Sequence, residues 1–271
     1  MVVQHNLTAM NSNRMLGLTS ASQAKSTEKL SSGYKINRAA DDAAGLAISE
    51  KMRRQVRGLT QASANAQDGI SMVQTAEGAL NEVHDMLQRM NELAVKSANG
   101  SNQTEDQGYI QKEVSALISE IDRVASTTTF NEQNLLGSNQ TFSLQVGAEN
   151  SANDRISVAI DKMNSTGLGV NGVDVSTTAG AQSAIDSIKS GIKVLNAQRA
   201  DLGAQQNRLE HTINNLDNVV ENTQSAESAI RDTDMATEMV KFSNNNILAQ
   251  AGQSMLAQAN QSNQGVLSLL G

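Results

Sequence analysis

Apolar side chains recur at alternating spacings of three and four residues in the last third of the chain. The series contains Ile185, Ile188, Ile192, Leu195, Leu202, Leu209, Ile213, Leu216, Val220 and Ile230. This heptad pattern predicts one long amphipathic helix over residues 181–231. At 1.5 Å per residue, the stretch from Ile185 to Ile230 would be roughly 70 Å long. That length favours an elongated helical bundle over an ordinary compact domain.

A second apolar series predicts partner helices over residues 43–126. The first of them would cover about 43–99, with Asp41 or Asp42 as its N-cap and Gly100 at its end. A shorter helix would follow, started by a capping box through Thr104 and Gln107. Their core positions are Val73, Ala76, Leu80, Val83, Leu87, Met90 and Ala94, then Ile110, Val114, Leu117, Ile121 and Val124.

Between residues 127 and 164 the period of the pattern shortens to two. Two runs alternate apolar with polar residues: Phe142, Leu144 and Val146, then Ile156, Val158 and Ile160. The polar stretch GAENSAND separates them, so we predict a β-hairpin with a long loop. Residues 165–180 are rich in Gly, Ser, Thr and Asn, which predicts a linker that tolerates insertions.

Both ends of the chain, residues 1–33 and 232–271, are apolar, poor in charge and expected to be helical. Polar, turn-prone segments, residues 34–42 and 231–234, connect them to the bundle. No charged residue follows Lys241, so the last helix lacks the charged face of an ordinary surface helix. The apolar positions at the two ends include Val3, Leu7, Met10, Leu18, Ile247, Leu248, Ala251, Met255, Leu256, Val266, Leu267 and Leu270.

Three environments could cover these apolar ends: the chain's own bundle, a membrane surface, or other copies of the chain. A membrane-surface helix usually carries Lys or Arg on its polar face, whereas the last helix carries Gln, Asn and Ser. Packing on the bundle stays possible from the pattern alone. Polymerisation explains the missing charge better, because amide side chains can exchange hydrogen bonds with neighbouring copies without burying charge.

Composition limits the other function classes. Aromatic residues make up 2% of the chain, and it has no Pro, Trp or Cys but 11 Met, so small aliphatic side chains must fill the core. The net charge of -7 argues against a nucleic-acid-binding protein. Without Cys there are no disulfides or thiolate metal ligands.

No recognisable catalytic pattern is present. His5, His84 and His211 lie far apart and match no zinc spacing, and phosphate-loop and GxSxG motifs are absent. We therefore expect no enzyme activity, cofactor or metal site. Polar residues interrupt the apolar tail too often for membrane insertion. The chain also opens without the residue pattern of a Sec-type leader.

Four long motifs resemble bacterial flagellin: TEKLSSGYKINRAADDAAGLAISEKMR, GLTQASANAQDGISMVQTAEGALNEVHDMLQRMNELAVKSAN, LGAQQNRLEHTINNL and MLAQANQ. They occur in the family's order, and the match leaves out only the linker region. The resemblance is to a short flagellin, of a kind found in Gram-positive bacteria, that lacks the variable outer domains. These would be replaced here by residues 165–180.

The resemblance implies a secreted, extracellular subunit of the bacterial flagellum. It would be exported by the flagellar type III system and would polymerise into the filament used for motility. The implied fold is mainly α, an elongated antiparallel helical bundle or coiled coil with a small β-hairpin. The terminal helices, residues 1–33 and 232–271, would pair as an inner coiled-coil layer, joined to the bundle by a spoke at residues 34–42. The implied partners are other flagellin subunits, the filament cap, hook-associated junction proteins and an export chaperone on the C-terminal helix.

Flagellins of this kind are also sensed by a host Toll-like receptor. The family's contact stretch is matched by Gln88, Arg89, Glu92, Leu93 and Glu113, which otherwise read as exposed positions of bundle helices. A competing hypothesis is a secreted hook–filament junction protein or receptor-binding helical module that forms no long filaments. Its ends would be docking arms instead of a repeating lattice.

Overall fold

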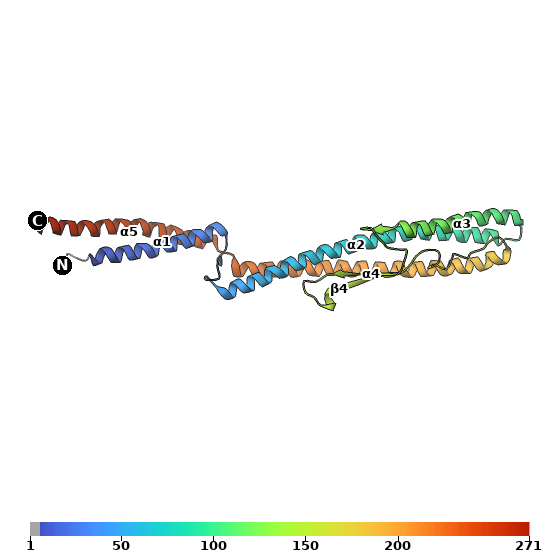
Figure 1. Ribbon diagram of the computed structural model, residues 1–271, viewed down its shortest axis with the longest axis horizontal. Coiled ribbons are helices and arrows are strands. Elements are labelled where there is room, and N and C mark those ends of the chain that lie inside the picture. Colours follow the sequence, from blue (N-terminus) through green and yellow to red (C-terminus); the bar gives the residue numbers. More distant parts are fainter. Residues whose placement is uncertain (1–5, 271) are drawn as a thin grey trace. The chain divides into compact units, whose positions relative to one another are not determined.

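The structure is a computed structural model that describes residues 6–270, with side chains described for residues 6–262. As predicted, the described chain is mainly α with a small β-hairpin (Figure 1). The helices are α1 (Leu7–Ser32), α2 (Ala43–Ser97), α3 (Thr104–Thr127), α4 (Thr178–Arg231) and α5 (Met235–Leu270). The strands are β1 (Thr129–Phe130), β2 (Gln133–Asn134), β3 (Gln140–Gln145) and β4 (Arg155–Ile160).

The chain divides into two compact units, one of Met1–Gln55 with Asn222–Gly271 and one of Val56–Glu221. Both α2 and α4 contribute to both units. The first turns of α2 and the last turns of α4 therefore group with the terminal helices. The sequence pattern assigns these turns to the bundle, because α2 and α4 each continue as one helix from one unit into the other.

The second unit is a helical bundle with a continuous apolar core. The predicted heptad positions supply it: Leu80 and Leu87 of α2, Ile121 of α3, and Leu195 and Leu202 of α4 are each 0% exposed. Val158 and Ile160 of β4 join the same cluster. The prediction of a bundle of amphipathic helices is thus confirmed.

The helix starts follow the predictions only in part. Asp42 caps α2 as expected, because its Oδ1 accepts a hydrogen bond of 2.9 Å from the Gly45 backbone N–H. The predicted box at Thr104 and Gln107 is wrong by one residue. The N-cap of α3 is Gln103, whose backbone N–H donates to Asp106 Oδ2 over 3.3 Å. Gln107 is instead buried and donates to the Ser97 carbonyl over 3.0 Å.

The strands form two antiparallel hairpins. The predicted one joins β3 and β4, with Phe142 opposite Val158 and Leu144 opposite Ile156. The sequence pattern missed the short β1–β2 hairpin, which turns at Asn131 and Glu132. Both residues have positive φ, 47° and 64°, as a tight two-residue hairpin turn requires.

Residues 165–180 form no loose linker, contrary to the prediction. Leu168, Val170 and Val175 are at most 3% exposed and belong to the bundle core. The Ser165 hydroxyl donates to Asp122 Oδ2 over 2.9 Å, and the Ser97 hydroxyl donates to the Val175 carbonyl over 2.5 Å. The segment therefore packs on the helices, and α4 begins within it at Thr178.

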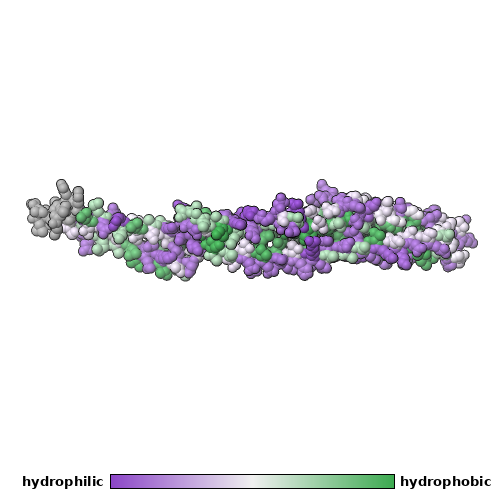
Figure 2. Space-filling model, turned by 90° about the horizontal axis from the view of Figure 1, so that it is seen from below, coloured by the Kyte–Doolittle hydropathy of each residue, from purple (hydrophilic) through white to green (hydrophobic). Residues whose placement is uncertain are grey.

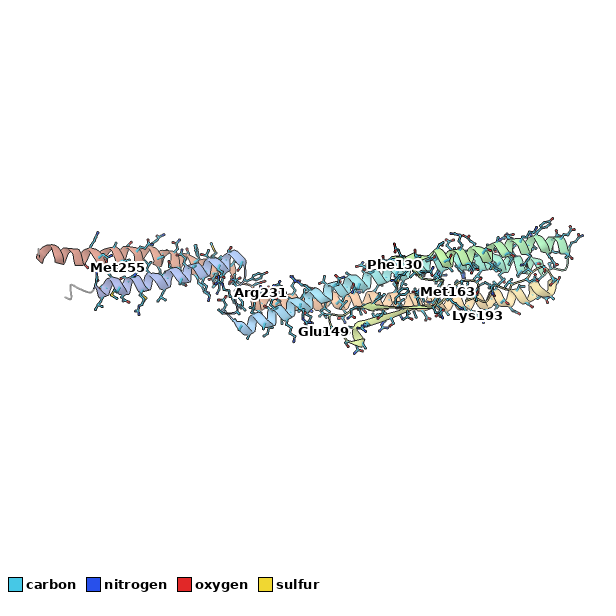
Figure 3. All side chains as sticks on the ribbon, in the orientation of Figure 1. Phe130, Glu149, Met163, Lys193, Arg231 and Met255 are labelled. Atoms are coloured by element: carbon cyan, nitrogen blue, oxygen red, sulfur yellow. The ribbon has the colours of Figure 1, made fainter. Side chains whose placement is uncertain are left out.

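In the first unit, α1 and α5 run antiparallel side by side (Figure 1). Residues 34–42, the predicted spoke, are held by specific contacts. Tyr34 pairs with Asp232 in a β-bridge, and the Arg231 guanidinium lies 4.5 Å from the centre of the Tyr34 ring (Figure 3). Arg231 also forms an ion pair of 2.9 Å with Glu50.

Asp41 fixes the other end of the spoke. Its carboxylate pairs with the Lys25 ammonium of α1 at 2.9 Å and accepts from the backbone N–H groups of Arg38 and Asn37. These interactions, that with Lys25 above all, lower the pKa of Asp41 to about 2. The connection between α1 and α2 is thus an ordered turn.

Candidate assembly interface

The seam between α1 and α5 is a heptad series of mostly small or polar side chains. On both helices the buried or half-buried positions alternate by three and four residues, as in a coiled coil. On α1 they are Ala9, Ser12, Leu16, Thr19, Gln23, Ser26 and Leu30, and on α5 they are Glu238, Phe242, Asn245, Ala249, Gly252, Leu256 and Ala259.

These small residues allow the two helices to approach closely. Cα atoms of α1 and α5 lie repeatedly within 8 Å of each other, as expected when small side chains set the interhelical distance. At Gly252, an added Cβ would lie 3.3 Å from Leu16 Cδ1. Leucine at such positions would push the helices apart.

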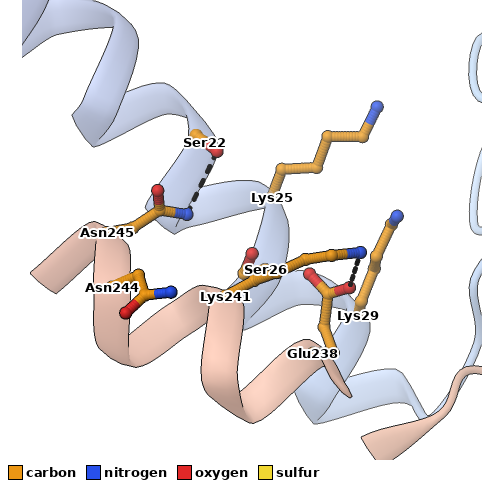
Figure 4. Close-up of a pocket in the computed structure, with 8 residues that line it drawn as sticks. All are labelled: Ser22, Lys25, Ser26, Lys29, Glu238, Lys241, Asn244 and Asn245. Carbon is orange, nitrogen blue, oxygen red and sulfur yellow. Dashed lines mark hydrogen bonds and ion pairs between the residues drawn. The ribbon is translucent and has the colours of Figure 1, made fainter.

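Polar groups cross the seam and fix its register. The Asn6 side chain donates to the Ala259 carbonyl over 3.0 Å, and Asn245 donates to Ser22 Oγ over 3.1 Å. Glu238 is 5% exposed and interacts with the Ser26 side chain. Figure 4 marks the contact between its carboxylate and the Lys241 ammonium. The Ser26 interaction is a hydrogen bond to the carboxylate. This hydrogen bond, with Lys241 at 3.4 Å, keeps the pKa of the Glu238 carboxyl below its ordinary value despite its burial.

Besides Leu16, Leu30, Phe242 and Leu256 in the seam, most large apolar side chains of the pair lie outside it. Leu7 is 70% exposed, Met10 65%, and Leu18 and Ile247 63% each. Figure 2 shows apolar residues, in green, on the surface of this pair. The exposed apolar set contains Leu7, Met10, Met15, Leu18, Met235, Met239, Val240, Ile247, Leu248 and Met255.

The residues predicted for polymerisation therefore separate into three groups. Leu7, Met10, Leu18, Ile247, Leu248, Ala251 and Met255 are exposed, and Leu256 lies half-buried in the seam. Val3 lies outside the described residues. Val266, Leu267 and Leu270 lie on α5 beyond the last described side chain.

An apolar groove lies between α1 and α5, and Met15, Leu248 and Met255 of the exposed apolar set line it. Its volume is about 300 Å³. Met15 and Leu16 of α1 and Leu248 and Met255 of α5 supply its apolar lining, together with Asn11, Ser12, Thr19, Ala251 and Gly252. Water-exposed apolar surface of this kind marks interaction sites in proteins.

A second predicted site, for receptor contact, lies on α2 and α3 and is only partly exposed. Gln88, Arg89, Glu92 and Glu113 are on the surface. Arg89 bridges the two helices, with Nη2 2.8 Å from Glu113 Oε1 and Nη1 3.1 Å from Glu92 Oε2. The hydrogen bonds that the Arg89 guanidinium donates to Glu113 and Glu92 raise its pKa above the ordinary value.

Leu93 does not belong to that surface. It is 2% exposed and packs in the bundle core. Leu93 follows the core residue Met90 by three positions on α2, and this spacing was the sequence signal that Leu93 is buried. Arg89, Glu92 and Glu113 form an ion-pair cluster on the surface, and beside it Glu113 lines a pocket together with Tyr109, Ile110 and the little-exposed Leu93.

Other classes of site find no support in the described chain. Within its described residues, no three His, Asp or Glu side chains gather closely enough to hold a metal ion. Among the described helices, none combines the length and apolarity needed to cross a membrane.

Comparison with known proteins points to one family. Residues 3–141 match the family model described as the bacterial flagellin N-terminal helical region, and residues 185–270 match the bacterial flagellin C-terminal helical region. A flagellin from Halalkalibacterium halodurans is 54% identical over 271 residues, with 100% of both chains covered.

Two more relatives cover different shares of the chain. The flagellar filament 31.3 kDa core protein of Treponema maltophilum is 52% identical over 287 residues, again with 100% of both chains covered. The crystal structure of Bacillus cereus flagellin has a TM-score of 0.50 and 29% identity, and covers 56% of this chain and 88% of that chain. The sequence similarity thus includes the terminal helices.

Proposed function

The chain belongs to the bacterial flagellin family, and from this premise we propose that the outer faces of α1 and α5 are the surface through which it polymerises. As a flagellin, the chain is a structural subunit of the flagellar filament, the extracellular part of the flagellum that serves motility. The observation that supports the proposed surface is the exposure of large apolar residues beside a seam of small ones.

The exposed apolar side chains of this surface would contribute burial energy to assembly. Leu7, Leu18, Ile247 and Leu248 are 57% to 70% exposed. Full burial of one such side chain contributes about 1.5–3 kcal/mol. Covering the exposed parts of these four would contribute roughly 4–8 kcal/mol before the entropy of ordering is subtracted. A single subunit cannot obtain this energy, because its own seam is already filled.

Seeded elongation tests the surface. We expect Leu18→Glu and Ile247→Glu to abolish growth from filament fragments, because each would bury an unpaired charge in the lattice. Leu18→Met, which keeps an apolar side chain of similar size, should still elongate. Far-UV circular dichroism of the soluble subunits provides the folding control. Elongation by a folded Leu18→Glu subunit at the unmodified rate would refute the proposed surface.

The competing function, a junction protein or helical module that forms no long filaments, predicts another outcome. Such a chain would bind to seeds without extending them, and electron microscopy would show no growth. Full-length identity of 54% to a flagellin supports the filament subunit over this alternative.

We further propose recognition of the monomer by a host Toll-like receptor through Gln88, Arg89, Glu92 and Glu113. Arg89→Ala should weaken the response of receptor-expressing reporter cells. Arg123→Ala is a matched control, since Arg123 is also an exposed, ion-paired arginine, with Glu120 at 2.6 Å. Equal responses to the two variants would remove Arg89 from the receptor site.

The remaining proposals concern secretion and assembly. Flagellins form a structural protein family, and we propose that the chain carries no catalytic activity. Export through the flagellar type III system would deliver it to the filament tip, where the cap and the hook-associated junction proteins contact it. An export chaperone would cover the exposed apolar face of α5, including Ile247 and Leu248. Loss of chaperone binding in Ile247→Glu would test that contact.

A further inference from the structure

Methionines are distributed unequally between the two units. The core methionines of the bundle, Met72, Met90 and Met163, are at most 5% exposed. By contrast, the exposed methionines of the described chain all lie on α1 and α5, at 47% to 65% exposure. We refer to this set as the exposed methionines: Met10, Met15, Met235, Met239 and Met255.

A peroxide would oxidise this chain mainly at its methionine side chains. The sequence has no Cys and no Trp, so the thioether is its most readily oxidised side chain. In the reaction a thioether sulfur attacks one peroxide oxygen, an S–O bond forms and the O–O bond breaks. The sulfur loses two electrons, the second peroxide oxygen leaves as water, and the product is methionine sulfoxide. Exposed sulfurs react first, because the peroxide must reach them.

Oxidation would change the surface on which assembly depends. Met15 of α1 and Met255 of α5 line the same apolar groove, across the seam from one another (Figure 3 labels Met255). A sulfoxide on either one places a strong hydrogen-bond acceptor in a mainly apolar groove, where Asn11, Ser12 and Thr19 are the polar lining residues. Burial of that acceptor without a partner opposes contact with the next subunit.

We propose that the exposed methionines are a peroxide-modification site that decides whether the free subunit can polymerise. The proposal rests on the polymerisation surface proposed above. Oxidation by a peroxide blocks the free subunit, whereas a subunit already in the filament is protected because its neighbours cover the sulfurs. A methionine sulfoxide reductase with a thiol reductant reverses the block.

Peptide mass spectrometry after hydrogen peroxide treatment tests the first step. In soluble subunits, sulfoxide should form at the exposed methionines well before it forms at Met72, Met90 and Met163. In filaments treated in the same way, the exposed methionines should react at least about tenfold more slowly, the loss expected when a contact worth 1.4 kcal/mol must open. Equal rates in the two samples would overturn the proposal.

Seeded elongation tests the consequence. Oxidised subunits should need a concentration about tenfold or more above the untreated one to elongate, and treatment with the reductase should restore growth. A variant with Met→Leu at all five positions keeps the surface apolar, so it should elongate both before and after peroxide treatment. Met15→Leu with Met255→Leu alone should recover part of this resistance, and it replaces the larger variant if that one misfolds.

Two outcomes would overturn the inference without affecting the proposed function. One is normal elongation by subunits that carry the sulfoxides, in an assay where Leu18→Glu still blocks growth. The other is equal peroxide sensitivity of a folded Met→Leu variant, which would place the damage elsewhere. If Leu18→Glu elongates normally, the polymerisation surface itself is wrong.

Discussion

Two glycines of the same helix provide a direct test of how residues 165–180 pack. Gly191 and Gly203 both lie inside α4, but their surroundings differ. A Cβ added at Gly191 would lie 3.0 Å from the Leu168 carbonyl oxygen and 3.3 Å from Val170 Cγ1, whereas at Gly203 nothing lies within 4 Å. Ala at either position favours the helix over Gly by about 0.8–1.0 kcal/mol.

Because this propensity gain is common to both variants, it cancels in their difference. Gly203→Ala should stabilise the chain by up to about 1 kcal/mol. Gly191→Ala must in addition displace an ordered segment, held by hydrogen bonds such as Val170 N–H to the Ser165 carbonyl at 2.9 Å, and overpacking of this kind costs about 1–3 kcal/mol. We therefore expect Gly191→Ala to be less stable than Gly203→Ala by about 1–3 kcal/mol.

Urea unfolding of soluble subunits, followed by far-UV circular dichroism, measures this difference. The unmodified chain is the common reference, and similar m-values would show that the variants unfold in the same way. If Gly191→Ala equals or exceeds Gly203→Ala in stability, residues 165–180 do not pack on α4 as the structure shows. The linker that the sequence predicts would then be correct.

Two further outcomes concern single side chains. Leu93→Ala should lower the free energy of unfolding by about 2–5 kcal/mol, because Leu93 is 2% exposed. Arg89→Ala should change it by less than about 1 kcal/mol, because Arg89 is an exposed ion-pair partner. Equal losses of stability for the two variants in urea unfolding would contradict this. The pKa of Glu238 is lower in the folded chain than the ordinary Glu value of about 4.3, so its ionised carboxylate stabilises the α1–α5 pair at pH values above about 4.3. This stabilisation disappears as the pH falls through the folded-state pKa. Acid titration followed by circular dichroism should therefore show a helix loss that Glu238→Gln makes less pH-dependent, and identical curves would exclude Glu238 as its source.

The long helices were predictable because large aliphatic residues recur at heptad spacing, with few polar interruptions such as Arg199 and Gln206. Leu80, Leu87, Leu195 and Leu202 follow the heptad series and all became core. The hairpin of β3 and β4 was predictable for a similar reason, since the period of two is clear. Residues 165–180 were misread because Gly, Ser and Thr outnumber the few aliphatic side chains that actually anchor the segment.

The face on which α1 and α5 meet could not be obtained from hydrophobicity. Ile247, Leu248 and Met255 form the most visible apolar series of the C-terminal helix, yet they lie outside the seam and are exposed. Ala249 and Gly252 form the seam together with Leu256. Small residues contribute little apolar area, so a search for large side chains finds the outer face first. Their heptad spacing, which Ser12, Thr19 and Ser26 share on α1, was the available signal.

The contrast between the two units explains why one chain can both fold alone and polymerise. In the bundle, large aliphatic side chains face inward, so most of their burial energy already stabilises the single subunit. In the terminal pair, mostly small residues and polar hydrogen bonds hold the helices together, and large side chains such as Leu18, Ile247 and Leu248 are exposed. A seam of leucines would make this pair more stable alone but would leave less apolar surface for neighbours. If the proposed polymerisation surface is correct, the small-residue seam leaves the burial energy of the exposed Leu18, Ile247 and Leu248 available for the contact between subunits.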